Sequence, residues 1–298
     1  MFKNLTLYRI GPDWHLSAEQ VEARLQAGRF VACGATQEKS VGWVEPRGQA
    51  HGALLESVAG QWICKLMVET RALPASVVQR KLQERLAQIE SSTGRKPGKK
   101  EARDLKDEVR LALLPQAFPK EATVLVWLDR DASLLLIDAA SVARAQEVAT
   151  LLVQTLPGLA LTLLDTQISP VSAMSGWLTS QEAPAGFAID RECELKAADE
   201  SKAVVRYTRH RLDIDEIGQY VTEGKLPTRL ALTWGDRVSL VLTESLQLKK
   251  LTFLEGVFEQ AGARDDDRFD ADVAIATGEL QKLLPDLIAA LGGMPVAA

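Results

Sequence analysis

Residues 94–120 read GRKPGKKEARDLKDEVRLALLPQAFPK and contain the most informative pattern in this chain. From Lys99 the spacing is helical, at about 100° per residue, so that basic and apolar side chains separate onto different sides. The helix should end at Pro115, because proline lacks a backbone N–H and clashes with the preceding turn. The basic side comprises Lys99, Arg103, Lys106 and Arg110, and the apolar side comprises Ala102, Leu105, Val109, Ala112 and Leu113.

Three more cations lie at the start of this segment. Arg95 and Lys96 precede the predicted helix and Lys100 lies in its first turn, while interleaved acids prevent a long run of one charge. A row of cations with helical spacing suits an extended row of negative charge. A solvated surface helix with ordinary charge mixing is the alternative, and the pattern alone leaves both interpretations open.

Four blocks of sequence occur in order along nearly the whole chain. They are FKNLTLYR at Phe2–Arg9, GWVEP at Gly42–Pro46, KKEARDLKDEVRLALLPQAF at Lys99–Phe118 and RFDADVAIATGELQKLLPDLIAALGG at Arg268–Gly293. Together these blocks resemble the bacterial recombination-associated RdgC family. Four separate blocks are far more specific than one short motif.

The resemblance implies a homodimer closed into a ring, whose positively charged channel encircles duplex DNA without reading its sequence. Single-stranded DNA is a further candidate partner. Proteins of this family restrain RecA-promoted recombination by occupying the DNA, so the resemblance also implies a nucleoid-associated protein. On this interpretation the DNA-binding residues include Arg95, Lys96, Lys99, Lys100, Arg103, Lys106 and Arg110.

A second basic segment, VVRYTRHRL, occupies Val204–Leu212. We expect a strand over residues 203–212, in which alternation puts Arg209 and Arg211 on one face and His210 on the other unless a bulge intervenes. The resemblance makes these three residues candidate DNA contacts. An exposed strand edge guarded by charge is an equal alternative.

Phe118 follows the helix break in a polar stretch, so no amphipathic period assigns it to a local core. It either packs against its own helices or marks an interface, as exposed aromatic side chains often do. The resemblance places the matching aromatic at the tip of a projecting lobe and implies that it closes the ring as a gate. A second, larger contact would then keep the dimer together.

Length and composition are those of a globular protein with more than one unit. The chain has 298 residues, 46% hydrophobic and 25% charged, with a net charge of −5 and a pI near 5.4. Attraction to nucleic acid must therefore come from local basic surfaces. The cysteines, Cys33, Cys64 and Cys193, lack metal-ligand spacing and are expected to be packing residues in a reducing cytoplasm. No apolar run is long enough for a membrane helix.

Strand patterns mixed with helices, without strict alternation, predict an α+β fold with mixed or antiparallel sheets. We expect a central α+β domain at residues 1–73 and 120–165, a helical hairpin forming a projecting tip domain at 74–119, and a base α+β domain at 166–298. Capping residues predict helices after Ser17 and Ser141. Residues 165–185 are expected to be a linker with a short helical piece, and residues 271–276 a strand.

Patterns that indicate catalysis are weak throughout. No HExxH motif, Cys/His cluster or nucleophile elbow occurs, and GRKPGKK lacks the spacing of a phosphate-binding loop. We expect Asp265, Asp266 and Asp267 to form a solvated turn rather than a metal site. The sequence predicts no enzyme activity, no metal and no cofactor. A protein-interaction module acting on RecA is the alternative function, and a nuclease would require a divalent metal.

Overall fold

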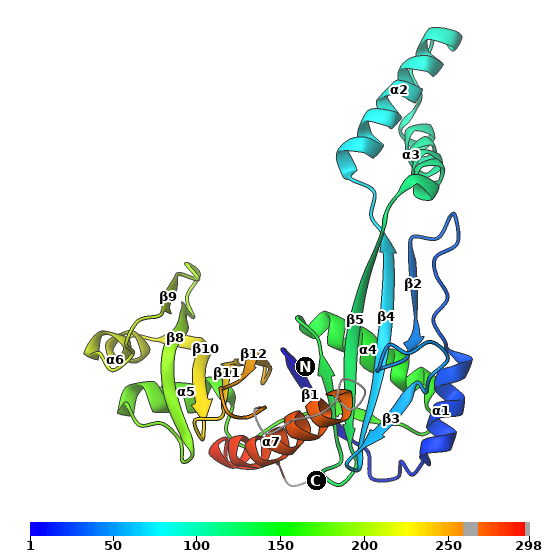
Figure 1. Cartoon of the computed structure of the whole chain (residues 1–298). Coiled ribbons are helices and arrows are strands. Elements are labelled where there is room, and N and C mark those ends of the chain that lie inside the picture. The colour runs from blue at the N-terminus through cyan, green and yellow to red at the C-terminus, as the bar shows by residue number, and fades with distance from the viewer. Residues whose placement is uncertain (259–267, 296–298) are drawn as a thin grey trace. The chain divides into compact units, whose positions relative to one another are not determined.

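A computed structural model describes residues 1–258 and 268–295 (Figure 1). The described residues form an α+β fold, as predicted. The strands are β1 (Leu5–Ile10), β2 (Lys39–Val44), β3 (Leu55–Val58), β4 (Gln61–Arg71), β5 (Pro119–Asp129), β6 (Leu134–Asp138), β7 (Leu161–Leu163), β8 (Phe187–Ala197), β9 (Val204–Thr208), β10 (Lys225–Trp234), β11 (Val238–Thr243) and β12 (Leu248–Phe253). The helices are α1 (Ala18–Ala27), α2 (Ala75–Thr93), α3 (Lys99–Leu113), the 3₁₀ turn η1 (Leu114–Gln116), α4 (Val142–Thr155), α5 (Pro170–Ser180), α6 (Asp215–Thr222) and α7 (Arg268–Ala290).

The chain divides into two compact units. Unit 1 comprises Met1–Arg24, Glu45–Cys64 and Leu125–Ala298, and unit 2 comprises Leu25–Val44 and Lys65–Val124. The division follows packing, and the three-part division expected from the sequence stays a prediction. The expected turn at Asp265, Asp266 and Asp267 lies outside the described residues.

Unit 1 contains an antiparallel sheet in the order β6-β1-β12-β11-β10-β8-β9. On β10 the side chains of Leu230, Leu232 and Trp234 are buried, and they belong to one core cluster with residues of α5, α6 and α7. Arg229, between the buried positions of β10, is exposed. Because strand side chains alternate, helices cover one face of these strands, and Arg229 lies on the other face.

Helix α7 corrects the predicted strand at residues 271–276, because the whole segment is helical. The alternation of small and apolar residues there matches a strand over six positions. Over the full helix, however, the buried residues recur at spacings of three and four: Val273, Ala276, Leu280, Leu283, Leu284 and Leu287. The longer period decides the structure.

Helix α5 confirms the short helical piece expected around Trp177 and corrects the linker interpretation of residues 165–185, because the helix runs from Pro170 to Ser180 and packs into the core. Ser169 caps it by accepting a hydrogen bond from the Ser172 backbone N–H, and Pro170 occupies the first turn. Met174 and Leu178 are buried in the core of unit 1. Pro170 lies in the first turn of this helix, Gly176 on its exposed side, and Pro184 beyond its end.

Two predicted helix caps are confirmed. Ser17 and Gln20 form a reciprocal capping box, with the Ser17 N–H donating to Gln20 Oε1 at 2.9 Å and the Gln20 N–H donating to Ser17 Oγ at 3.3 Å. Ser141 accepts from the Arg144 N–H at 3.3 Å. These local signals fix where α1 and α4 begin.

Unit 2 combines strand β2 and the adjoining parts of β4 and β5 with helices α2 and α3, which pack against each other. Gly94 ends α2 in the left-handed conformation, with its N–H bonded to the Glu90 carbonyl. Helix α3 ends at Leu113, and the 3₁₀ turn η1, which contains Pro115, follows directly. The predicted helix and its end are confirmed.

Candidate nucleic-acid interface

The predicted basic side of α3 is exposed. Lys99, Arg103, Lys106 and Arg110 are all open to solvent, whereas Val109 is buried and Leu105 is half-buried. The four cations are three or four residues apart, so successive ones are displaced by about 4.5–6 Å along the helix axis. They form the α3 basic row.

The cations near α3 differ in whether they have acidic neighbours. Arg95 makes a two-bond contact with Glu101, at 2.8 and 3.1 Å, which raises the pKa of Arg95 and lowers that of Glu101. Arg110 pairs with Glu38 at 2.8 Å, and Lys96 lies 3.7 Å from Glu90.

These contacts are solvent-exposed, and such pairs contribute only about 0–1 kcal/mol, so a phosphate can displace the acid. Within the described residues, no acid lies within ion-pair distance of the other four cations. They are Lys99, Lys100, Arg103 and Lys106.

Phe118 is 91% exposed, between η1 and the start of β5. This corrects the expected position at the tip, because the chain returns along α3 before it reaches Phe118, and the Gly94–Gly98 turn lies at the other end of α3. The alternative in which Phe118 packs against its own helices is also wrong. A large aromatic side chain this open to water is typical of a contact surface.

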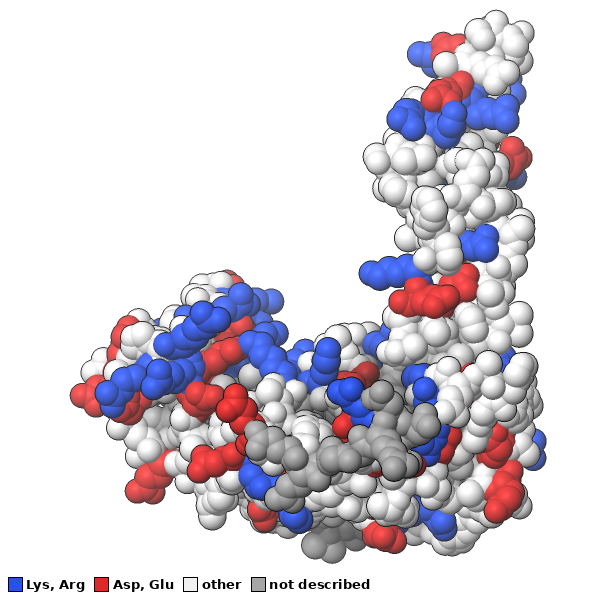
Figure 2. Space-filling view, viewed as in Figure 1, with Lys and Arg blue, Asp and Glu red and all other residues white. Residues whose placement is uncertain are grey.

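A second basic surface lies on unit 1, on the face of the sheet that the helices leave open. Figure 2 shows Lys and Arg atoms gathered over the β8–β9 region, with acidic atoms among them. A groove of about 260 Å³ there is lined by three cations, Arg191, Arg209 and Lys250, and by Asp190 and Glu192. We call it the sheet groove.

Acidic side chains hold two cations of this surface. Lys250 contacts both carboxylate oxygens of Glu192 at 2.7 Å, and Arg206 pairs with Glu194. Partial burial alone would raise the pKa of Glu194, but hydrogen bonds from Thr228 and Arg206 outweigh it and lower the pKa. The Glu194 carboxylate is therefore charged at neutral pH, where it holds Arg206.

The predicted strand over residues 203–212 is too long, since β9 ends at Thr208 and Arg209 has a left-handed φ of 56°. The alternation expected for Arg209, His210 and Arg211 is therefore wrong. Arg209 lines the sheet groove, whereas Arg211 lines a different pocket and pairs with Asp213. His210 donates its backbone N–H to the Arg191 carbonyl, and its Nδ1 lies 2.7 Å from the Arg211 carbonyl oxygen.

Sequence analysis missed Arg191 and Lys250 as members of this surface. Both lie in strands, but on β8 and β12, which the sequence separates by more than fifty residues and the sheet brings to one groove. The neighbouring lysines Lys249 and Lys250 can be seen in the sequence as a basic pair. Only the order of the strands in the sheet shows that Lys250 lies beside Arg191 and Arg209.

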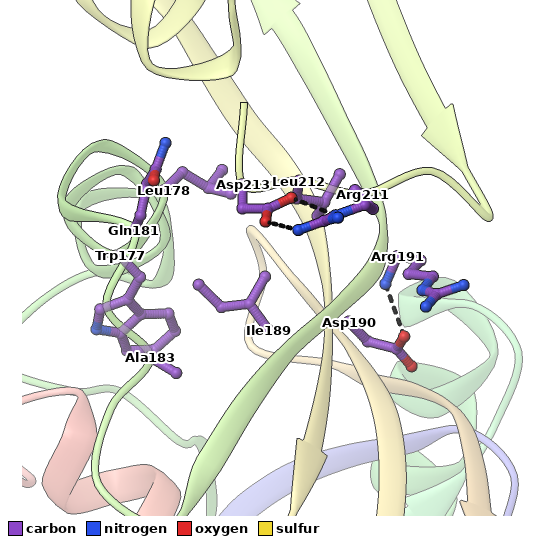
Figure 3. Close-up of a pocket in the computed structure, with 10 residues that line it drawn as sticks. All are labelled: Trp177, Leu178, Gln181, Ala183, Ile189, Asp190, Arg191, Arg211, Leu212 and Asp213. Atoms are coloured by element: carbon purple, nitrogen blue, oxygen red, sulfur yellow. Dashed lines mark hydrogen bonds and ion pairs between the residues drawn. The ribbon is translucent and has the colours of Figure 1, made fainter. Parts of the chain in front are cut away.

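The pocket lined by Arg211 has a volume of about 440 Å³ (Figure 3). Its walls are apolar, formed by Trp177 and Leu178 of α5, Ile189 of β8 and Leu212. Polar groups from Gln181, Asp190, Arg191, Arg211 and Asp213 complete its lining. We call it the α5–β8 pocket.

The three cysteines are buried and free, as predicted, and burial raises the pKa of the Cys193 thiol to about 12. Within residues 1–258 and 268–295, no group of three or more His, Cys, Asp and Glu side chains is arranged to hold a metal ion. No helix among these residues is both long enough and apolar enough to cross a membrane.

The described molecule is thus an α+β protein that presents exposed cations on each of two compact units. A family model described as "Putative exonuclease, RdgC" matches residues 1–294. The chain belongs to the RdgC family.

Relatives named recombination-associated protein RdgC match along the whole chain. The one from Dechloromonas aromatica is 46% identical and covers 100% of this chain and 99% of its own length. Those from Cupriavidus pinatubonensis and Bordetella pertussis are 44% and 41% identical, each covering 98% of both chains. The resemblance seen in the four sequence blocks is confirmed.

Proposed function

We propose that this protein binds duplex DNA without sequence preference, encircles it as a homodimeric ring, and restrains RecA-promoted recombination by occupying the DNA. The α3 basic row carries this proposal. Its members Lys99, Arg103 and Lys106 are exposed, regularly spaced and without an acidic partner among the described residues. A phosphate backbone is the extended anion that such a row fits.

The side chains present favour backbone contacts over base readout. Lysine and arginine on a regular surface neutralise phosphates, which positions a protein on DNA but conveys no sequence information. The sheet groove supplies a second set of cations, Arg209, Arg191 and Lys250, on the other unit. A ring with a basic channel and an acidic exterior needs its cations gathered on particular surfaces of a chain that is acidic as a whole. The α3 basic row and the sheet groove are two such surfaces.

The ring proposal depends on Phe118 and on the α2–α3 hairpin. An aromatic residue this exposed, directly after the α2–α3 hairpin, is suited to a reversible contact with a second copy of the chain. We propose that Phe118 closes a gate through which DNA enters, while a larger contact elsewhere holds the dimer. On this proposal the protein is associated with the nucleoid and catalyses no reaction.

Salt-dependent binding tests the proposal. Affinity for duplexes of unrelated sequence should be equal and should fall steeply with salt, with a slope of about −0.9 in log K against log salt for each phosphate neutralised. Sequence preference, or a flat slope, would contradict it.

The same kind of experiment distinguishes two other possible functions. A module that acts on RecA directly would bind RecA in the absence of DNA and show little affinity for duplex. A nuclease, the activity that the family description suggests, would degrade linear or nicked plasmid when magnesium is added. We expect intact plasmid and a shifted gel band.

A further inference from the structure

The α5–β8 pocket has walls suited to a flat, uncharged ring. In Figure 3 the indole of Trp177 and the side chain of Ile189 lie on facing sides of the open space. Trp177 and Ile189 are each half-buried, and Leu212, which also lines the pocket, is buried. Half-buried walls of this kind leave part of the Trp177 side chain accessible to a ligand in the pocket.

Polar groups along one side of the pocket can recognise the edge of such a ring. Gln181, which is exposed, offers an amide that both donates and accepts hydrogen bonds. Arg211 and Asp213 are paired with each other at the rim, with Arg211 Nε 3.0 Å from Asp213 Oδ1 (Figure 3). Donors and acceptors are therefore both present around an apolar floor.

A β-bulge joins this pocket to the sheet groove. Leu230 pairs with Cys193 and Leu232 with Ile189, so Ala231 of β10 faces the segment Asp190–Glu192 of β8. Asp190 and Arg191 in this bulge line both the pocket and the groove. Bulges re-aim side chains and are common beside functional sites, and this one makes the two cavities neighbours across a single strand.

We propose that the α5–β8 pocket holds an unpaired nucleobase of a DNA strand whose phosphates lie in the sheet groove. The inference rests on the proposed function and deepens it, since it adds a preference for DNA with an unpaired base. The occupant follows from continuity with the groove: Arg209 and Lys250 attract phosphate, and one strand away Trp177 offers a stacking face. Every base has such a face, so the contact requires no particular sequence.

Duplexes that carry one unpaired 2-aminopurine test the proposal. The parent protein should bind this duplex roughly 10-fold more tightly than the perfectly paired one, in line with one base stacked on an aromatic side chain. The fluorescence of 2-aminopurine should fall on binding, because stacking quenches it. Trp177→Leu should abolish both effects and leave affinity for the paired duplex unchanged.

A second variant guards against misfolding of Trp177→Leu, since Trp177 also packs against the core. Ala183 is half-buried and lines the pocket. Ala183→Phe should fill the pocket, keep Trp177 in place and again abolish the preference for the unpaired base. As a matched control, Lys250→Ala should weaken binding of both duplexes equally.

The outcomes separate the two proposals. If neither duplex is bound, the proposed function is wrong. If both are bound with equal affinity and the 2-aminopurine fluorescence is unchanged, or if a folded Ala183→Phe variant keeps the preference, the pocket proposal is overturned and DNA binding stands.

Discussion

Gly42 lies where another backbone segment packs so closely against β2 that no side chain fits. Residues 28–30 run beside β2, with the Trp43 N–H bonded to the Gly28 carbonyl and the Phe30 N–H bonded to the Trp43 carbonyl, each at 2.9 Å. A Cβ at position 42 would lie 2.4 Å from Phe30 Cα and 2.6 Å from Phe30 N. Both neighbours are backbone atoms, so neither can rotate away.

Gly42→Ala should therefore destabilise unit 2 by about 1–3 kcal/mol, the usual cost of overpacking a well-packed site. Thermal unfolding of the variant, followed by circular dichroism, measures the effect. Gly34→Ala is the matched control in the same unit, because a Cβ there meets only the end of the Gln37 side chain, at 3.9 Å. Equal midpoints for the two variants would contradict this account.

Arg237 and Glu279 connect the β10–β11 hairpin region to α7. Arg237 donates to both carboxylate oxygens of Glu279, at 2.6 and 2.8 Å, and Glu279 is only 6% exposed. The hydrogen bond from Arg237 lowers the pKa of Glu279 below its ordinary value of 4.5. A carboxylate with a lowered folded-state pKa stabilises the fold when it is ionised.

The stability that Glu279 contributes should therefore be complete above about pH 4.5 and should be lost as the pH falls through the lower folded-state pKa. Glu279→Gln should cost about 1–2 kcal/mol at pH 7, as for a hydrogen bond to a charged group that is partly open to water. Unfolding midpoints of parent and variant should converge on acidification. Glu84→Gln, which breaks an exposed pair with Lys81, should change the midpoint little at any pH.

Helix α3 is the element on which the functional proposal can be tested most directly. Its apolar side packs and its basic row does not, so the two can be changed independently.

Changing Lys99, Arg103, Lys106 and Arg110 together to Ala should weaken binding to every duplex alike and flatten the salt slope. The fold should persist, because alanine favours helices and the packed side is untouched. Gel shifts across a salt series measure both effects.

The charge-preserving variant is the control for α3. Exchanging each Lys for Arg and each Arg for Lys at these four positions keeps the charge and changes the geometry of every donor group. A surface that only neutralises phosphates should keep its affinity and slope, whereas a surface that reads bases through Arg should lose specific binding.

At the scale of elements, the sequence predicted helix starts well where a few neighbouring residues decide them. The caps at Ser17 and Ser141 are both decided by neighbouring residues. Predictions failed where a longer period overrides a short pattern and where packing between distant segments decides. The α7 segment at 271–276 is helical because the helical period of the whole segment extends through it, and α5 is a core helix because Met174 and Leu178 pack into the core of unit 1.

At the scale of the whole molecule, the fold creates a site from residues that no single helix or strand contains. Arg191, Arg209 and Lys250 lie on three different segments, and only the order β12-β11-β10-β8-β9 brings them to one groove. The α3 row, in contrast, was predictable in full because four residues on one helix need no tertiary information. The proposed dimer likewise cannot be predicted from local sequence patterns. The sequence identified Phe118 only as an aromatic residue that belongs to no amphipathic helix or strand pattern.

At this scale the gate can be tested with closed DNA circles. Phe118→Ala should leave the protein dimeric in sedimentation, since the proposal assigns the larger contact to another surface, and should shorten its residence on closed circles several-fold. Linear DNA, from which a ring can slide off an end, should show a smaller difference. Equal residence of parent and variant on circles would count against a gate at this position.

The α2–α3 pair interrupts two neighbouring strands, leaving after β4 and returning before β5. At that point Thr70 Oγ1 donates to the Lys120 carbonyl at 3.4 Å, so the two ends of the excursion are already held together by the sheet. An excursion of this kind is a cassette: a loop whose ends are fixed side by side can be shortened or exchanged at little cost in chain entropy. Residues 74–118 could therefore be replaced by a two-residue Asn-Gly turn, giving a shorter protein in which DNA binding by the sheet groove can be measured without the α3 basic row.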